Sequence, residues 1–188
     1  MKKKTDNDNL SKKLAIRLLA IDALKKRGVG SIHVLDCFAG DGTLWRFLKK
    51  EYGNSIQHVG IDTEMRSVAK YLGDNRKYLQ YLPINDFDLI DIDAYGVPYE
   101  QLQIISKRQY KGIIVGTFIQ CLYGGLPYAM LEELGYSRKM VRKITKLFFA
   151  NGWKKWSSYL KLVGYDSVQV YHCANKHYFC CFPKEFGS

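Results

Sequence analysis

The segment from His33 to Trp45, HVLDCFAGDGTLW, combines residue types that can hold a nucleotide-like ligand. An apolar run ends in Asp36 and is followed by two glycines, Gly40 and Gly42, before a helical pattern begins. Glycines at the turn between a strand and a helix let a ligand approach the backbone closely. The segment therefore predicts a strand, a glycine turn and a helix that together bind such a ligand.

Two side chains of this turn indicate which ligand it suits. A dinucleotide-binding fingerprint has Gly or Ala three residues after its second glycine, so that helix and strand pack closely, whereas this chain has Trp45 there. Phosphate prefers a helix N-terminus without negative charge, and Asp41 occupies this one. A sulfonium cation joined to an amino acid and an adenosine suits a negative turn better. The turn thus favours S-adenosylmethionine as its ligand.

Carboxylates also end two later apolar runs. Asp62 ends the run His58–Asp62, about 20 residues after the glycines, where an acidic residue can bind both hydroxyls of a ribose. A second interpretation is that Asp62 only caps a helix that starts near Glu64. The run Phe87–Asp93 ends in a carboxylate as well. Because ligands of open parallel sheets bind beyond the carboxyl ends of the strands, we expect these carboxylates to lie near the glycine turn.

Apolar periodicity predicts alternating strands and helices over much of the chain. Helices are expected at Leu10–Lys26, Thr43–Glu51, Glu64–Leu72 and 98–107, and strands at Ile32–Cys37, His58–Asp62, Tyr78–Leu82, Phe87–Asp93 and Gly112–Phe118. This order argues for an α/β fold with a mostly parallel sheet. The later part predicts a basic amphipathic helix over Ser137–Ala150, a further helical stretch and a hairpin of two antiparallel strands, Ser167–Cys173 and His177–Phe182.

Composition and charge narrow the class of protein. The chain has 188 residues, 47% of them apolar and 25% charged, which are ordinary values for one globular domain. Its 29 Lys and Arg residues exceed its 18 Asp and Glu residues by 11, and this excess favours a polyanionic partner, most commonly nucleic acid. A cationic surface that only keeps the protein in solution is the alternative.

Cysteine use and hydropathy bear on the compartment. The chain has five cysteines, an odd number, and its start lacks the pattern of a secretory leader, so we expect a cytoplasmic protein with reduced thiols. The apolar run from Leu14 is interrupted by Arg17 and Asp22, which argues against a membrane span. The pairs His172-Cys173 and Cys180-Cys181 alternate between the two faces of a strand, so we expect no metal site there.

A basic and aromatic segment is the candidate substrate surface. Arg138, Arg142 and Lys143 share one predicted helix, and Trp153 and Lys154 follow it. Lys and Arg interleaved with aromatic rings suit phosphate contacts and base stacking, so these five are candidate substrate-binding residues. The alternative is a solvated helix face whose tryptophans belong to the core.

Three motifs together resemble the class I S-adenosylmethionine-dependent methyltransferases: Asp36-x-Phe38-x-Gly40-x-Gly42, Asp62, and the run Asp91–Pro98. The Asp-x-Phe-x-Gly-x-Gly form is similar to enzymes that methylate nucleobase amino groups. The run DIDAYGVP is most similar to the tRNA guanine dimethyltransferases, which carry Asp-x-Asp-Pro-Tyr/Phe-Gly-Ser-Pro. The motifs cover the chain from about Leu10 to Phe118.

The resemblance implies roles for the residues that bind the cofactor. Gly40 and Gly42 would approach its methionine and adenosine parts, and Phe38 would pack beside it. Asp36 would fix the loop or meet the ammonium group through water. Asp62 would hold the ribose.

The residue that contacts the adenine amine is less directly indicated. Asp74, Asn75 and Asp86 all follow the ribose carboxylate in the sequence. The separation between Asp62 and Asp74 is short for a helix plus a strand. We therefore expect Asp86 to make this contact.

The second motif implies the acceptor chemistry. The amine of a nucleobase is a poor nucleophile because its lone pair is delocalised into the ring. A carboxylate on Asp93 that accepts one N–H would position the lone pair toward the methyl group, and Tyr95 could stack on the base. This chain has Ala94 where the family has proline, which makes the turn less rigid.

By this resemblance, residues 1–188 form a single methyltransferase domain with a Rossmann-like, seven-stranded, mostly parallel sheet, an antiparallel C-terminal hairpin and helices on both faces. Residues 1–9 are expected to be a flexible basic tail, and 120–163 a substrate-side loop with basic helices. The expected activity is methylation of an exocyclic amino nitrogen of a nucleobase, with RNA favoured over DNA and no membrane partner. The alternatives are methylation of a protein or small-molecule amine, and a non-catalytic nucleic-acid-binding protein with the same fold.

Overall fold

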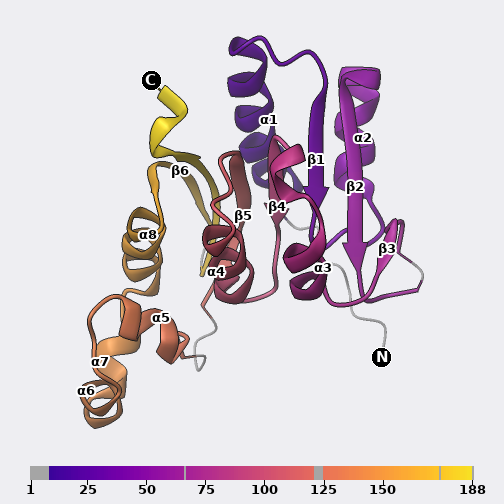
Figure 1. Cartoon of the computed structure of the whole chain (residues 1–188). Helices are drawn as coiled ribbons and strands as arrows, with labels where there is room; N and C mark the ends of the chain where they lie inside the picture. The colour runs from indigo at the N-terminus through magenta and orange to yellow at the C-terminus, as the bar shows by residue number, and fades with distance from the viewer. Residues whose placement is uncertain (1–8, 66, 121–124, 174, 188) are drawn as a thin grey trace.

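The computed structural model describes residues 9–65, 67–120, 125–173 and 175–187. Over these residues, seven strands form one sheet with the order β3-β2-β1-β4-β5-β7-β6 (Figure 1). The strands are β1 (Ile32–Asp36), β2 (Ile56–Asp62), β3 (Tyr71–Leu72), β4 (Leu89–Ile92), β5 (Ile113–Ile119), β6 (Tyr165–Cys173) and β7 (Lys176–Pro183). Strands β1 to β5 pair in parallel, while β7 is antiparallel to both β5 and β6. The predicted mostly parallel sheet with a C-terminal antiparallel hairpin is confirmed.

Helices cover both faces of the sheet, as expected. The helices are α1 (Leu10–Lys26), α2 (Thr43–Tyr52), α3 (Asn75–Tyr81), α4 (Tyr99–Lys107), α5 (Tyr128–Glu133), α6 (Arg138–Lys143), α7 (Thr145–Phe149) and α8 (Gly152–Leu162), with short 3-10 turns at Gly53–Ser55, Ile84–Asp86 and Lys184–Gly187. Helices α1 and α2 pack on one face, against a core that includes Val34, Leu89 and Val115. Helices α3, α4 and α8 pack on the other face, where alternation along the strands places Leu35 and Ile114.

The register of the sheet brings the polar strand ends to one edge. Asp36 of β1 lies opposite Gly60 of β2 on one side and Asp91 of β4 on the other. Because these strands are parallel, the segments that follow them leave the sheet at the same edge. The glycine turn, Asp62 and the loop after β4 are therefore neighbours in space although they are distant in sequence.

Two predicted elements are wrong. The helix expected over Glu64–Leu72 is replaced by loops and by β3, because the chain there pairs with the end of β2, as in the hydrogen bond from the Lys70 amide to the Gly60 carbonyl at 3.0 Å. The strand expected over Tyr78–Leu82 lies largely in α3. The side chain of Asp74 caps this helix by accepting a hydrogen bond from the Arg76 amide at 2.9 Å.

The helix predicted over Ser137–Ala150 is interrupted rather than continuous. Ile144 adopts φ −136° and ψ 60°, which separates α6 from α7. Residues 1–8 and 121–124 fall outside the described ranges, so the flexible tail and the first part of the substrate-side loop stay predictions. Among the helices of the described ranges, none has the length and apolar character needed to cross a membrane.

Candidate active site

A cavity of about 880 Å³ opens at the carboxyl edge of the sheet. Its walls include Phe38 and Gly40 of the glycine turn, Asp62 at the end of β2, and Asp93 and Tyr95 after β4. Small-molecule sites in proteins commonly have volumes of about 300–1,000 Å³. The structure thus brings five of the residues singled out in the sequence around one cavity of suitable size.

A second, smaller cavity of about 90 Å³ adjoins the first and contains the remaining residues of the glycine motif. Asp36 and Gly42 line it, together with the N-terminal half of α1 and the start of α2. The two cavities share four lining residues: Lys13, Phe38, Gly40 and Asp93. They are therefore two parts of one site that meet at the glycine turn.

The backbone of the glycine turn is open to this site. Gly40 and Gly42 have φ values of +52° and +69°, which side-chain-bearing residues rarely adopt. A Cβ atom on Gly40 would meet only the Phe38 carbonyl oxygen, 3.9 Å away, so a side chain there would project into the open space of the site. A Cβ atom on Gly42 would come within 2.3 Å of Val68. Gly40 therefore leaves room for a ligand that a side chain would fill, whereas Gly42 is required because the Val68 side chain packs against it.

Asp62 fixes the turn and faces the large cavity. Its Oδ2 accepts a hydrogen bond from the Gly40 amide at 2.7 Å, and its Oδ1 accepts one from the Glu64 amide at 2.8 Å. A carboxylate has about four acceptor positions, so these two bonds leave capacity for the hydroxyls of a ligand. The helix that the capping interpretation required does not form after Asp62.

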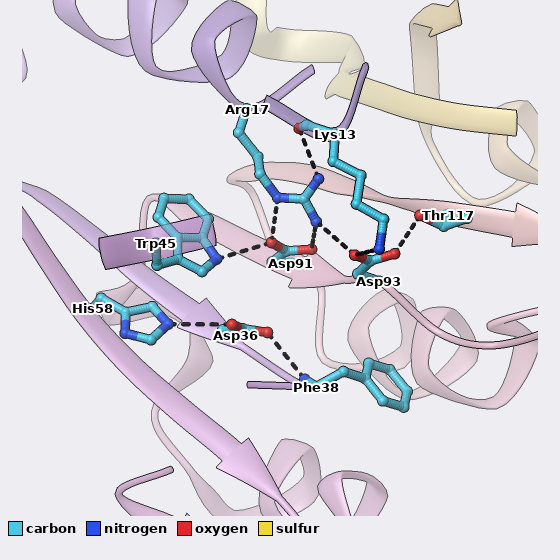
Figure 2. A network of polar contacts seen from close by, with 9 residues as sticks. All are labelled: Lys13, Arg17, Asp36, Phe38, Trp45, His58, Asp91, Asp93 and Thr117. Carbon is cyan, nitrogen blue, oxygen red and sulfur yellow. Dashed lines mark hydrogen bonds and ion pairs between the residues drawn. The ribbon is translucent and has the colours of Figure 1, made fainter. Parts of the chain in front are cut away.

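Asp36 holds the loop from the other side. Its Oδ1 accepts a hydrogen bond from the Phe38 amide at 3.0 Å, and its Oδ2 lies 3.2 Å from Nε2 of His58 (Figure 2). The side chain of Asp41 accepts a hydrogen bond from the Thr43 amide at 3.0 Å. That bond is the main reason why the pKa of Asp41 is lowered. This carboxylate therefore lies just before α2 and bonds its first amide, at the N-terminus where a phosphate would otherwise bind.

Asp86 does not join the site, and we correct its expected role. It precedes β4, at the amino edge of the sheet, where Nδ1 of His33 lies 3.3 Å from its carbonyl oxygen. Asn75, by contrast, is buried and donates to the Cys37 carbonyl at 2.8 Å, while its Oδ1 accepts from Gln101 at 3.0 Å. Gln101 lines the large cavity. This arrangement has little signal in the sequence, because the strand β3 that precedes Asn75 has only two residues.

A buried ion-pair network lies beneath the site and was missed in the sequence. The Arg17 guanidinium of α1 makes two bonds of 2.7 Å to the carboxylate of Asp91, and the Trp45 indole donates to the same carboxylate at 3.0 Å (Figure 2). Burial alone would lower the pKa of Arg17, but Asp91 and Asp93 outweigh it and raise this pKa. The signal for this network in the sequence is the cation of Arg17 within the apolar face of a predicted helix.

Asp93 is reached by partners from three directions. Nζ of Lys13 lies 2.9 Å from its Oδ2, Nη2 of Arg17 lies 3.4 Å from the same oxygen, and the Thr117 hydroxyl donates to Oδ1 (Figure 2). Burial would raise the pKa of Asp93, but Arg17, Lys13 and Thr117 outweigh it and lower this pKa. Asp93 is therefore an ionised carboxylate with both oxygens engaged.

The loop after Asp93 presents an aromatic ring at the cavity. The Tyr95 side chain is 83% exposed, so its ring can stack on an incoming ligand. The loop is held at its ends, because the Ala94 amide donates to the Ile92 carbonyl at 2.7 Å and the Ile119 amide to the Gly96 carbonyl at 2.8 Å. These bonds restrain the turn in which Ala94 stands where the tRNA guanine dimethyltransferases have proline.

The candidate substrate-binding residues divide into two groups. Arg138, Arg142 and Lys143 on α6 and Lys154 on α8 are exposed. Trp153 instead packs against the sheet, where its ring stacks on His177 with centroids 4.7 Å apart and borders Phe118 and Phe179. This packing favours the alternative in which the tryptophan belongs to the core.

The basic helices are attached to the edge of the sheet where the cavity opens. Figure 1 shows α5, α6 and α7 grouped at the end of the molecule toward which β1 and β2 point. Nε2 of Gln120 donates to the Phe149 carbonyl at 2.6 Å, and Gln120 directly follows the cavity residue Ile119. Glu133 of α5 accepts hydrogen bonds from Tyr99 at 2.6 Å and Tyr159 at 2.9 Å, which joins α4, α5 and α8.

Comparisons with known proteins identify the fold. No family model matches the chain, and no curated protein matches it in sequence. Among solved structures, the plantazolicin methyltransferase BpumL in complex with a monoazolic desmethylPZN analog and SAH has a TM-score of 0.58 and 12% identity, with 95% of this chain and 87% of that chain covered. A protein assigned as an S-adenosyl-L-methionine-dependent methyltransferase of Methanococcus maripaludis has a TM-score of 0.51 and 13% identity, with 95% and 89% covered. The plantazolicin methyltransferase BamL has a TM-score of 0.52 and 15% identity, with 87% and 66% covered. At these identities the similarity establishes the fold, which is that of the class I S-adenosylmethionine-dependent methyltransferases.

Proposed function

We propose that this chain is an S-adenosylmethionine-dependent methyltransferase. The observation that carries the proposal is the single site in which the open glycine turn, Asp62 and the loop from Asp93 to Tyr95 meet. The residues fit the cofactor, because Gly40 leaves open space at the turn and Asp62 keeps acceptor positions for a ribose. When bound, the cofactor supplies a methyl group activated by a positively charged sulfur. The carboxylates of Asp36 and Asp41 beside the glycine turn suit that positive charge better than a phosphate-binding turn would.

We propose further that the acceptor is an exocyclic amino nitrogen of a nucleobase. The Asp93 carboxylate would accept one N–H of the amine, which turns the lone pair toward the methyl group, and the exposed Tyr95 ring would stack on the base. The role of these residues is positioning and electrostatic stabilisation, because the lowered pKa of Asp93 makes it a weak base.

RNA is the proposed carrier of this base. Between residues 134 and 165 the chain has eight Lys and Arg residues and no Asp or Glu. This segment includes α6, α7 and α8, and the bond from Gln120 to Phe149 connects it to the cavity wall. A cationic surface beside the cavity suits a polyanion whose unpaired base enters the site. RNA is favoured over DNA because the Asp91–Pro98 run resembles the tRNA enzymes.

Two alternatives each have an observation in their favour. The full engagement of Asp93 by Lys13, Arg17 and Thr117, together with Ala94, favours a nucleic-acid-binding protein that keeps the fold without catalysis. The desmethylPZN analogs in the BpumL and BamL structures favour a protein or small-molecule amine as acceptor. The experiment must therefore show whether methyl transfer takes place and which of these molecules accepts the methyl group.

The test is transfer of label from S-adenosylmethionine to separate fractions of tRNA, ribosomal RNA, DNA, protein and small amines, followed by nucleoside mass spectrometry. We expect label in an amino-methylated nucleoside of RNA, and loss of at least about 100-fold in rate with Asp93→Ala. Label in protein or in small amines, and not in RNA, would contradict the proposed nucleobase acceptor and support the corresponding amine instead. Binding of S-adenosylhomocysteine and RNA without any transfer would support the non-catalytic alternative.

A further inference from the structure

Lys13 is the side chain that connects the two parts of the site. It lines both the small cavity at the glycine turn and the large cavity at Asp93. Its ammonium group lies 2.9 Å from Oδ2 of Asp93, and the two side chains are 19% and 17% exposed. The pair therefore stands at the boundary between the region proposed for the cofactor and the region proposed for the acceptor.

This pair obstructs the proposed acceptor site. Oδ2 of Asp93 already has two cationic partners, Lys13 and Arg17, so it can accept an N–H from an acceptor only if one of these two withdraws. Thr117 is fixed in β5 and only 2% exposed. Arg17 is held by two bonds to Asp91 and by a bond of 2.8 Å to the Lys13 carbonyl. Lys13 alone among these partners has a long, partly exposed side chain and a single ionic contact to give up.

The small cavity offers Lys13 a second position. Four carboxylates line it (Asp36, Asp41, Asp91 and Asp93), but among its lining residues the cations are only Lys13 and Arg17. Arg17 is committed to Asp91. A ligand carboxylate beside the glycine turn would face this negative wall, and Lys13 is the cation within reach that can turn to it.

We propose that Lys13 exchanges one carboxylate for another: it pairs with Asp93 in the free protein and with the methionine carboxylate of the cofactor in the loaded protein. The exchange releases Oδ2 of Asp93, so the acceptor amine can bind only after the cofactor. The inference rests on the proposed function, since it assumes that the small cavity takes the methionine part. It also explains how an Asp93 engaged on both oxygens can still serve an acceptor.

Calorimetric binding of two ligands tests the exchange without measuring activity. S-adenosylhomocysteine has the methionine-type carboxylate, and 5′-methylthioadenosine lacks the whole amino-acid part. We expect Lys13→Met to weaken S-adenosylhomocysteine binding by roughly 10-fold or more, in line with the loss of a charge-assisted bond. The affinity for 5′-methylthioadenosine should change less than about 2-fold. Lys13→Arg should keep most of the affinity for S-adenosylhomocysteine.

The direction in which Asp93→Asn changes the affinity for S-adenosylhomocysteine decides whether the exchange takes place. If Asp93 competes for Lys13, removing its charge must strengthen S-adenosylhomocysteine binding by a few fold, and this gain must vanish in the Lys13→Met background. A gain that persists in the double variant would mean ordinary charge repulsion and would overturn the exchange. Weaker or unchanged binding in Asp93→Asn would overturn it as well. Retained 5′-methylthioadenosine binding shows that each variant is folded.

The failures of the two proposals are distinguishable. A wild-type protein that binds neither ligand contradicts the proposed function itself. A wild-type protein that binds both, with a Lys13→Met variant of unchanged affinity for S-adenosylhomocysteine, contradicts only the exchange.

Discussion

The carboxylate of Asp62 accepts the backbone amide of Gly40 at 2.7 Å, although 22 residues separate them in the sequence. The residue proposed to hold the ribose therefore also fixes the glycine turn in its left-handed conformation. Ligand binding and loop geometry depend on the same side chain. A substitution at Asp62 should affect every ligand that contains the ribose, whatever else the ligand carries.

We expect Asp62→Ala to weaken both S-adenosylhomocysteine and 5′-methylthioadenosine by about 10- to 100-fold, the loss typical of hydrogen bonds to a charged group. Asp62→Asn keeps one acceptor oxygen and should lose less. Calorimetry of both ligands measures the effect. The contrast with Lys13→Met is the control, because that variant should discriminate between the ligands and Asp62→Ala should not. Unchanged affinity in Asp62→Ala would contradict the ribose assignment.

The Arg17–Asp91 pair makes a prediction about stability. Arg17→Met leaves the Asp91 carboxylate buried with no cation bonded to it, and breaking a buried pair in this way typically costs about 3–5 kcal/mol of unfolding free energy. Adding Asp91→Asn removes the stranded charge and keeps an acceptor for the Trp45 indole, so the double variant should recover part of the loss. Urea unfolding measures both.

The exposed Arg46→Met is the matched control, and a surface substitution of this kind should stay within about 0.5 kcal/mol. If Arg17→Met were as mild as Arg46→Met, the network would not stabilise the fold. If Asp91→Asn deepened the loss caused by Arg17→Met, the stranded charge would not be its cause.

The sequence predicted those parts of the fold that have a local signal. The buried strands β1, β4 and β5 are apolar runs, and the glycine turn and Asp62 follow from motif spacing. The strand β3 could not be found by periodicity, because two residues carry none and its partner β2 determines it. The helix α3 was missed because its apolar residues suggested a strand, although Asp74 is a recognisable cap.

The site was predictable in its carboxylates but not in its cations. Arg17 and Asp91 lie 74 residues apart, so their pairing depends on how α1 packs on the sheet. The same packing places Lys13 at Asp93. The role of Trp153 could not be predicted for a related reason. A tryptophan beside lysines is equally typical of a base-stacking residue and of a core residue, and only the stacking of Trp153 on His177 in the structure decides between them.

The basic helices make a prediction about salt dependence. Lys139, Arg142, Lys143 and Lys146 are exposed on α6 and α7, while Arg138 is paired with Glu132. Replacing the four exposed residues Lys139, Arg142, Lys143 and Lys146 by Gln should weaken the binding of total tRNA. If each contacts one phosphate, the magnitude of the slope of log affinity against log salt concentration should fall by roughly 3. Filter binding from low to high salt measures this slope.

The control replaces four lysines at the opposite edge of the molecule, in the last turns of α1 and α2, by Gln: Lys25, Lys26, Lys49 and Lys50. This variant has the same net charge as the first but should keep the slope of the wild-type protein. Equal slopes for the two variants would mean that tRNA senses only net charge, and would argue against a specific surface on α6 and α7.

The His172–His177 pair on the terminal hairpin predicts a pH dependence of stability. Their Nδ1 atoms lie 2.5 Å apart, and the half-buried His177 stacks on Trp153. Burial and then the neighbouring His172 lower the pKa of His177 to about 4. The unfolded chain binds this proton near its ordinary pKa of about 6.5, so stability should be full above that pH and fall as the pH drops toward 4.

Because His177 is partly exposed, solvent screening limits this contribution to about 1 kcal/mol. His177→Phe keeps a ring against Trp153 and cannot take up the proton. We therefore expect the stability difference between variant and wild type to shift in favour of the variant between pH 6.5 and pH 4, and to be constant above pH 7. Urea unfolding at a series of pH values measures it. Parallel curves for the two proteins over the whole range would show that His177 is not the titrating group.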